Sequence, residues 1–321
     1  MTEILTAYFA ERERVDGRFL AEAMLDRLAE RGVQTSVMLR GIASFGSTNI
    51  IRSDRTLSLS EDPPIAITAV DTADRIGAVA EEVAAMTGVG LLTREHTTAV
   101  PAHGDVRVTL FLPRQRHFAV CDELFGLGFH SAEVLLGVDG TVAGRRERAR
   151  FFGRNTAVPV MVSGVGTAEA ARAALARYPD VPVTVAPVVV CKQLGRAVTT
   201  PPAGAAFGKL VIRTAEDARH DGQAIHRALI RELKTAGGSG ATVLRGVWGF
   251  HDGGRPHGDR LLQLARHVPV RTVIIDTPPR VAQAFAIVDA LTSETGLVTY
   301  EPVAAVLARH HGGSRGDLAT G

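Results

Sequence analysis

The sequence has little cysteine and no long apolar run, and each shortage excludes a class of protein. Its 321 residues include two cysteines, Cys121 and Cys191, which lie far apart and outside any CxxC motif. Neither a disulfide framework nor a cysteine-based zinc site is therefore expected, and a reducing cytoplasm suits such a chain. The first residues, MTEILTAYFAERERV, carry charges where a signal peptide or membrane helix would be apolar. We expect a cytoplasmic protein that does not insert into a membrane.

The sequence also lacks a marked excess of charge of either sign. Its 36 basic and 34 acidic side chains are interspersed and give a formal net charge of +2. No basic stripe of the kind that follows a phosphate backbone stands out, so nucleic acid is not expected as a partner. What the chain does have is apolar content of 45%, enough for the cores of two or three domains.

An internal repeat with an offset of 205 residues organises the sequence. The run VMLRGIASF from Val37 matches TVLRGVWGF from Thr242, and AVDT from Ala69 matches IIDT from Ile274, without a gap. A fainter middle copy has EVLLGVDG from Glu133 and PVMVSGVGT from Pro159, and it has lost the arginine and the aspartate of these motifs. The pattern predicts three tandem copies of one unit.

Within a copy, strand and helix patterns follow the order βαββαβ. ILTAYF is typical of a strand, RFLAEAMLDRLAERG has the apolar spacing of a helix closed by Gly32, and PIAITAVD is typical of another strand, followed by a helix that Thr72 is expected to cap. The fold class predicted is α+β, with ferredoxin-like units whose helices cover one sheet face. The other face is also apolar, so we expect the three units to close it against one another.

Linkers rich in proline and glycine set the expected domain limits. The predicted units are listed here: repeat 1 at 1–101, a divergent repeat 2 at 102–195, repeat 3 at 207–307, and a disordered tail at 308–321.

The motifs YFAERERVDGRFL, TSVMLRGIASFG and LSLSEDPPIAITAVDTADRI resemble the PII-like family known as domain of unknown function 190 (DUF190). The family resembles PII signalling proteins, which form trimers with adenine nucleotides in clefts between subunits. The resemblance implies a pseudo-trimer in a monomeric chain and a non-enzymatic regulatory role. The expected ligand is a small anionic metabolite or nucleotide, and the expected target is another protein.

Two alternatives stay open at this point. Genes of the family often lie beside fluoride channels, so the chain could be a ligand-free interaction protein that partners a membrane channel. It could also be a metal-dependent enzyme, although no nucleophile elbow, paired-carboxylate pattern or Walker loop is present in the sequence.

The LRG motif supplies the first candidate ligand residues, because a guanidinium suits phosphate or carboxylate and glycine lets backbone approach a ligand. An arginine that pairs with an acid at a repeat interface is the alternative. The candidates are Arg40, Gly41, Phe45, Gly46, Arg245 and Gly246.

The turn after the second helix is the place where PII proteins hold phosphates, and it supplies the second set. Small residues there can expose backbone N–H groups to an anion, but a plain helix C-cap is the favoured explanation of Gly88 and Gly296. The candidates are Thr87, Gly88 and Gly90, with Thr295 and Gly296 as their expected counterparts.

The loop GFHDGGRPHGDR of the third copy gives weak metal candidates, His251 and His257, near Asp252 and Asp259. Solvated loop histidines are the alternative. Asp71 and Asp276 precede helices, where negative charge stabilises the N-terminus.

Overall fold

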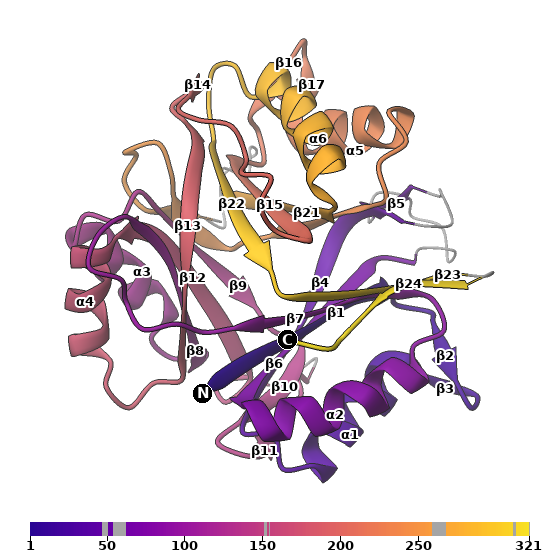
Figure 1. Cartoon of the computed structure of the whole chain (residues 1–321). Helices are drawn as coiled ribbons and strands as arrows, with labels where there is room; N and C mark the ends of the chain where they lie inside the picture. The colour runs from indigo at the N-terminus through magenta and orange to yellow at the C-terminus, as the bar shows by residue number, and fades with distance from the viewer. Residues whose placement is uncertain are drawn as a thin grey trace.

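The structure is a computed structural model of the chain and describes residues 1–46, 51–53, 62–150, 153, 155–258, 268–310 and 313–320. It is a mixed α+β fold with many strands and few helices, as Figure 1 shows. The main elements fall into three successive groups, each with the order strand, helix, strand, strand, helix, strand.

The first group contains β1 (Thr2–Ala10), α1 (Leu20–Glu30), β4 (Thr35–Phe45), β6 (Pro64–Thr72), α2 (Ala73–Met86) and β7 (Gly90–His96). The middle group contains β8 (Asp105–Pro113), α3 (His117–Gly126), β9 (Ser131–Leu136), β12 (Pro159–Thr167), α4 (Ala168–Arg177) and β13 (Val183–Gln193). The third group contains β15 (Phe207–Ala215), α5 (Ile225–Thr235), β18 (Ala241–Arg245), β21 (Pro269–Asp276), α6 (Pro278–Leu291) and β22 (Leu297–Val303).

Shorter strands extend the loops and edges of these groups. They are β2 (Arg14–Val15), β3 (Arg18–Phe19), β5 (Arg52–Ser53), β10 (Asp139–Val142), β11 (Arg145–Arg146), β14 (Arg196–Ala197), β16 (Arg219–His220), β17 (Gln223–Ala224), β19 (Trp248–Phe250), β20 (His257–Gly258), β23 (Ala305–His310) and β24 (Gly313–Asp317).

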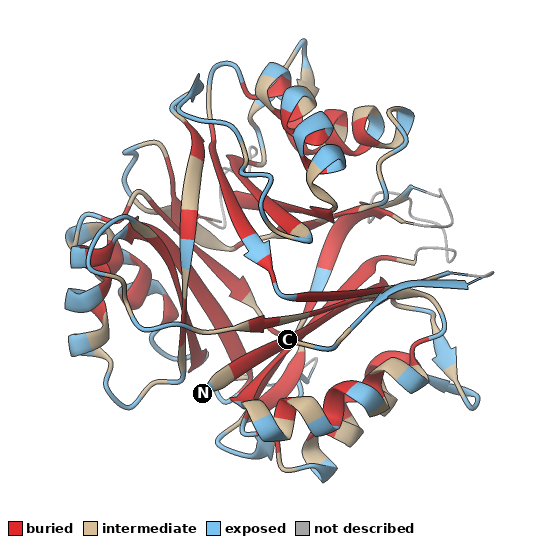
Figure 2. Ribbon diagram, viewed as in Figure 1, coloured by how far each residue is buried: buried red, intermediate tan, exposed pale blue. Residues whose placement is uncertain are grey.

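Each group forms one antiparallel sheet with the strand order expected of a ferredoxin-like unit. The orders are β7-β1-β6-β4, β13-β8-β12-β9 and β22-β15-β21-β18. One face of each sheet packs against the two helices of its own group, and the helix pairs lie on the outside of the molecule (Figure 1). The strands between them are almost wholly buried (Figure 2).

Local chemistry sets the ends of the helices. Gly32 adopts a φ of +66° after α1, a left-handed conformation that glycine adopts without strain. Thr167 caps α4, since its side chain accepts a hydrogen bond from the backbone N–H of Ala170. Thr72 stands at the equivalent position of α2, but its side chain makes no such bond; Asp71 instead accepts one from the Thr72 N–H at 2.7 Å.

Strand pairing joins the three groups edge to edge. The C-terminal half of β4 leaves its own sheet and pairs with β18, while β19 pairs with β9 and β10 pairs with β4. On the opposite edges, β13 continues onto β22 and β23 onto β7. Thr98 donates a backbone hydrogen bond of 2.9 Å to Val185, which links the first group to the middle one. Each group therefore contacts both others through backbone hydrogen bonds.

The sheet faces that the helices leave uncovered meet in the interior of the molecule. An apolar cluster there takes residues from all three groups, among them Ile4, Phe111 and Leu244. Buried charged side chains from the three groups lie beside it, and the sequence analysis did not foresee them.

The C-terminal segment differs from the predicted disordered tail at 308–321. β23 runs to His310, β24 pairs with it, and the Leu318 carbonyl accepts a hydrogen bond of 3.3 Å from Arg94. The physical reason is that the edge of β7 offers unpaired backbone groups, which β23 satisfies. In the part of the chain that the structure describes, no helix has the length and apolar character that crossing a membrane requires.

Candidate ligand cleft between the first and third groups

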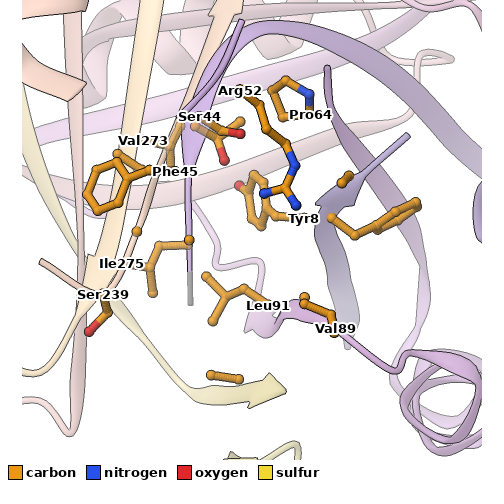
Figure 3. A pocket seen from close by; sticks show the side chains of 18 of the residues that line it. Tyr8, Ser44, Phe45, Arg52, Pro64, Val89, Leu91, Ser239, Val273 and Ile275 are labelled. Atoms are coloured by element: carbon orange, nitrogen blue, oxygen red, sulfur yellow. The ribbon is translucent and has the colours of Figure 1, made fainter. Parts of the chain in front are cut away.

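A cavity of about 130 Å³ opens where the first group meets the third. Figure 3 shows the side chains around it, which come from β1, the end of β4, β5, the turn before β7, and the third group. Its described lining residues are Tyr8, Phe9, Ala10, Glu13, Ser44, Phe45, Gly46, Arg52, Pro64, Val89, Gly90, Leu91, Ser239, Gly240, Ala241, Thr242, Val273, Ile275, Ala308 and Arg309.

The crossing of β4 from one sheet to the other creates this cleft, and Gly41 permits the crossing. A Cβ atom at Gly41 would lie 2.7 Å from both the Pro64 ring and the Val243 carbonyl oxygen. Gly246 is placed in the same way, with a Cβ 2.7 Å from the Pro269 ring. The two glycines predicted as ligand residues therefore allow close packing of neighbouring groups.

Phe45 lies beyond the crossing and packs into the core of the third group. It is 3% exposed and belongs to the cluster that contains Leu229 and Val243. Phe250 makes the corresponding contact in the core of the middle group. The conserved spacing within the repeat thus inserts an aromatic ring into the neighbouring core, while one side of Phe45 still borders the cavity.

Arg40 and Arg245 lie outside the described lining of this cavity. Arg40 donates a hydrogen bond of 2.8 Å to Glu11, and Arg245 donates one of 2.6 Å to Glu216. Both acids belong to the same group as their arginine and are themselves related by the 205-residue offset. The acid-pairing alternative therefore describes their contacts, but the pairs form within a group and not at an interface between groups.

Gly90 borders the cavity, whereas Thr87 and Gly88 end the preceding helix. The Thr87 hydroxyl donates a hydrogen bond of 2.7 Å to the Val83 carbonyl, and Gly88 is exposed with open space around it. A Cβ at Gly90 would lie 2.7 Å from the Tyr8 carbonyl oxygen, so this position needs glycine.

The counterpart of Thr87 in the third group is Thr292, which corrects the predicted pairing with Thr295. Thr292 donates to the Val288 carbonyl at 2.6 Å, as Thr87 does to Val83. One additional residue in the following turn then brings Gly296 level with Gly90. The 205-residue offset itself pairs Thr87 with Thr292, and the error arose because the Thr-Gly dipeptide at 87–88 recurs at 295–296.

The turn at Thr295 and Gly296 already holds an anion, the carboxylate of Asp252. One Asp252 oxygen accepts hydrogen bonds from the Thr295 hydroxyl at 2.8 Å and from the Gly296 N–H at 2.6 Å. The other accepts one from the Leu194 N–H of the middle group at 3.3 Å. This turn can therefore hold an anion, and the chain's own carboxylate fills it.

The charged side chains of the described lining are two arginines, Arg52 and Arg309, and one acid, Glu13. Arg52 pairs with Asp62 at 3.1 Å, and Figure 3 shows its guanidinium on the same side of the cavity as Tyr8. The Nε of Arg309 is buried and has no hydrogen-bond partner among the described residues. Burial, with a smaller effect from Glu95, raises the pKa of Tyr8, so its hydroxyl stays protonated and can donate a hydrogen bond.

The sequence analysis missed Tyr8, Arg52 and Arg309. Arg309 lay in the segment predicted to be disordered, although the short apolar run VAAVLA at 303–308 could have indicated a buried strand. Nothing in the sequence distinguished Tyr8 or Arg52 from other strand and loop residues.

The metal candidates do not form a complete ligand set among the described residues. His251 and His257 have ring centroids 6.4 Å apart, and His251 lies 3.9 Å from Asp252. No group of three or more histidine, cysteine or acidic side chains suited to a metal occurs in the described ranges, and Asp259 falls outside them.

Comparison with known proteins gives the same two segments as the repeat. The sequence profile of DUF190, described as an uncharacterized ACR, matches residues 2–99 and again residues 207–305. The UPF0166 protein of Aquifex aeolicus (strain VF5) is 26% identical over 98 residues, which are 30% of this chain and 92% of that protein. The predicted resemblance is thereby confirmed for the first and third copies.

Proposed function

Because this chain belongs to the DUF190 family, we propose that it is a non-enzymatic regulatory protein of PII-like type. Three βαββαβ units would form the equivalent of a PII trimer within one chain. The cleft between the first and third units would bind a small anionic ligand, and a protein target would read its occupancy.

The way the three groups join supports the single-chain trimer. At every junction a crossing strand pairs with the neighbour. At two of the three junctions an outer strand also pairs with the neighbour, and between the first and middle groups the backbone hydrogen bond from Thr98 to Val185 makes the outer link. A crossing glycine recurs in the middle group, where a Cβ at Gly137 would lie 2.2 Å from the Pro159 carbonyl oxygen. The middle group thus shares the packing device of the other two, even though its sequence has diverged.

The observation that carries the ligand proposal is the combination of apolar walls and two arginines in one cleft. Tyr8, Leu91 and Ile275 offer a surface for a flat ring, while Arg52 and Arg309 can bind an anionic group. A volume of about 130 Å³ fits one ring system, so the rest of a nucleotide would lie at the mouth of the cleft. The described lining includes no histidine or cysteine, which favours binding over catalysis.

The other two clefts should not bind the same ligand. In the third group, Asp252 occupies the turn that would hold the anion. In the middle group, the residue that corresponds to Gly296 is Val181, and its N–H already donates a hydrogen bond of 3.3 Å to the Tyr178 carbonyl. We therefore expect one ligand per chain.

Isothermal titration of the full chain with adenine nucleotides tests the proposal. A fitted stoichiometry of one per chain is expected, and Arg309→Ala should weaken binding by about tenfold or more, since a hydrogen bond to a charged group contributes about 1.5 to 3 kcal/mol. Arg40→Ala is the matched control, because Arg40 lies outside the described lining of the cleft. This variant should bind the nucleotide with the same affinity as the wild type.

Three binding events of equal affinity, or the same affinity in both variants, would contradict the proposed site. If the nucleotides and a wider panel of small anions release no heat, a ligand-free interaction protein, such as one partnering a membrane channel, becomes the better hypothesis. Stoichiometric metal in the purified protein would instead favour the metal-dependent enzyme.

A further inference from the structure

A second cavity lies in the interior, where the three groups meet. It has a volume of about 60 Å³, enough for several water-sized molecules. Its lining includes one acidic side chain, Glu95, and three basic ones, Arg107, Lys209 and Arg271. An excess of positive charge in so buried a space requires an explanation.

Ion pairs behind the lining compensate most of this charge but not all of it. Glu301 pairs with Arg107 at 2.8 Å and with Lys209 at 2.9 Å, and Lys209 also contacts Glu95 at 2.6 Å.

A third carboxylate, Glu133, pairs with Arg271 and with Arg213, the latter at 3.1 Å. The described cluster therefore holds three carboxylates and four cations, each residue at most 8% exposed. One positive charge remains when all are ionised, and arginine does not give up its proton.

Two buried donors in this region lack a hydrogen-bond partner among the described residues. They are the hydroxyl of Thr184, which lines the cavity, and the Nη2 of Arg213. Burial lowers the pKa of Arg213 in spite of the nearby Glu133. A buried charge without a full counter-charge strongly destabilises the fold, and a buried donor without a hydrogen bond destabilises it further. Water would fill the volume but would leave the charge.

We propose that this cavity binds one small monovalent inorganic anion, of about the size of chloride or bromide, between Lys209, Arg271 and Thr184. The anion would neutralise the cluster and accept the Thr184 hydrogen bond. Its site adjoins the cleft, since Tyr8 and Val273 line both cavities, but it is formed by all three groups, so its role is to hold them together.

The test is the melting temperature of the full chain as bromide replaces gluconate at constant ionic strength. The melting temperature should rise by several degrees and then saturate, because the anion binds the native state alone. Lys209→Met makes the cluster neutral and should remove the bromide-dependent rise. Lys234→Met, on the outer helix α5, is the matched control and should keep it.

Thr184→Val serves where Lys209→Met does not fold, since it keeps every charge and removes one donor. The affinity for bromide, taken from the concentration that gives half of the rise in melting temperature, should fall by about tenfold or more. Crystals grown in bromide should show an anomalous peak beside Lys209, Arg271 and Thr184. A cavity holding ordered water without such a peak, or an equal rise in melting temperature for Lys209→Met, would overturn the proposal.

Discussion

The guanidinium of Arg107 donates two hydrogen bonds of 2.8 Å to the carboxylate of Glu301, 194 positions further along the chain. The pair joins β8 of the middle group to β22 of the third group in the interior, and Glu301 is 1% exposed. Contacts of this kind link the groups more specifically than apolar packing, because each charge needs its partner.

Replacing this carboxylate should therefore destabilise the whole chain. Glu301→Gln leaves Arg107 without its bidentate partner, and breaking a buried pair in this way costs about 3 to 5 kcal/mol. Denaturant unfolding measures the change. The exposed pair Arg148–Glu22 supplies the control, Glu22→Gln, which should cost about 1 kcal/mol or less. Equal losses for the two variants would show that the interior pairs are not special.

The same carboxylates predict how stability depends on pH. Burial alone would raise the pKa of Glu133 and Glu301, but the charges of their basic partners outweigh it and hold both pKa values below the ordinary value of 4.5 for glutamate. The unfolded chain then binds more protons than the native one below pH about 4.5. The free energy of unfolding should be fully retained above that pH and should fall as the pH drops through the native pKa values.

Unfolding measured between pH 3 and pH 7 checks this dependence. The Glu301→Gln variant should lose less stability on acidification than the wild type, since one of the responsible carboxylates is gone. A variant whose stability falls as steeply as that of the wild type would show that other groups set the pH dependence.

The aromatic rings inserted into neighbouring cores should contribute strongly to stability. Phe45→Ala and Phe250→Ala each remove a buried ring from the core of another group, which costs about 3 to 5 kcal/mol. Phe19, 43% exposed, is the control, and Phe19→Ala should cost about 1 kcal/mol or less. If Phe45→Ala and Phe250→Ala lose as little stability as Phe19→Ala, the inserted rings do not stabilise the packing of the groups.

The two equivalent arginines of the LRG motif should behave differently. Arg40 has a side chain 51% exposed, so Arg40→Ala should change stability by about 0 to 1 kcal/mol. The side chains of Arg245 and Glu216 are more buried, with 28% and 15% of their surfaces exposed. Arg245→Ala should therefore cost about 1.5 to 3 kcal/mol of stability. Thermal melts give both values, and a loss of ligand affinity in either variant would return these arginines to the ligand site.

The elements within one group could be predicted from local patterns, because apolar spacing reports which face a helix or strand buries. The helix before Gly32 and the strand from Pro64 follow directly from such spacing. A cleft between repeats was expected, but its lining could not be predicted, because Tyr8 and Arg309 come together only through the pairing of β23 with β7.

The ion pairs of the interior could not be predicted from the sequence for a related reason. In the sequence, Glu95 and Lys209 are each a polar residue near the end of an apolar strand pattern. Their sequence neighbours do not indicate that the two side chains contact each other. Their partners lie in other groups, at separations that no periodicity reports. The apolar contacts of the interior were expected, whereas its ion pairs needed the three-dimensional arrangement.

Three groups joined edge to edge would let one chain close on itself in the manner of a PII trimer. Multi-angle light scattering of the full chain tests this closure, because groups that satisfy one another's edges leave no reason to assemble three chains. We predict a mass of 34.0 kDa, the mass of a single chain, across a wide range of protein concentrations. A stable assembly of three chains would contradict the account, since it would mean that the groups pair between chains and not within one.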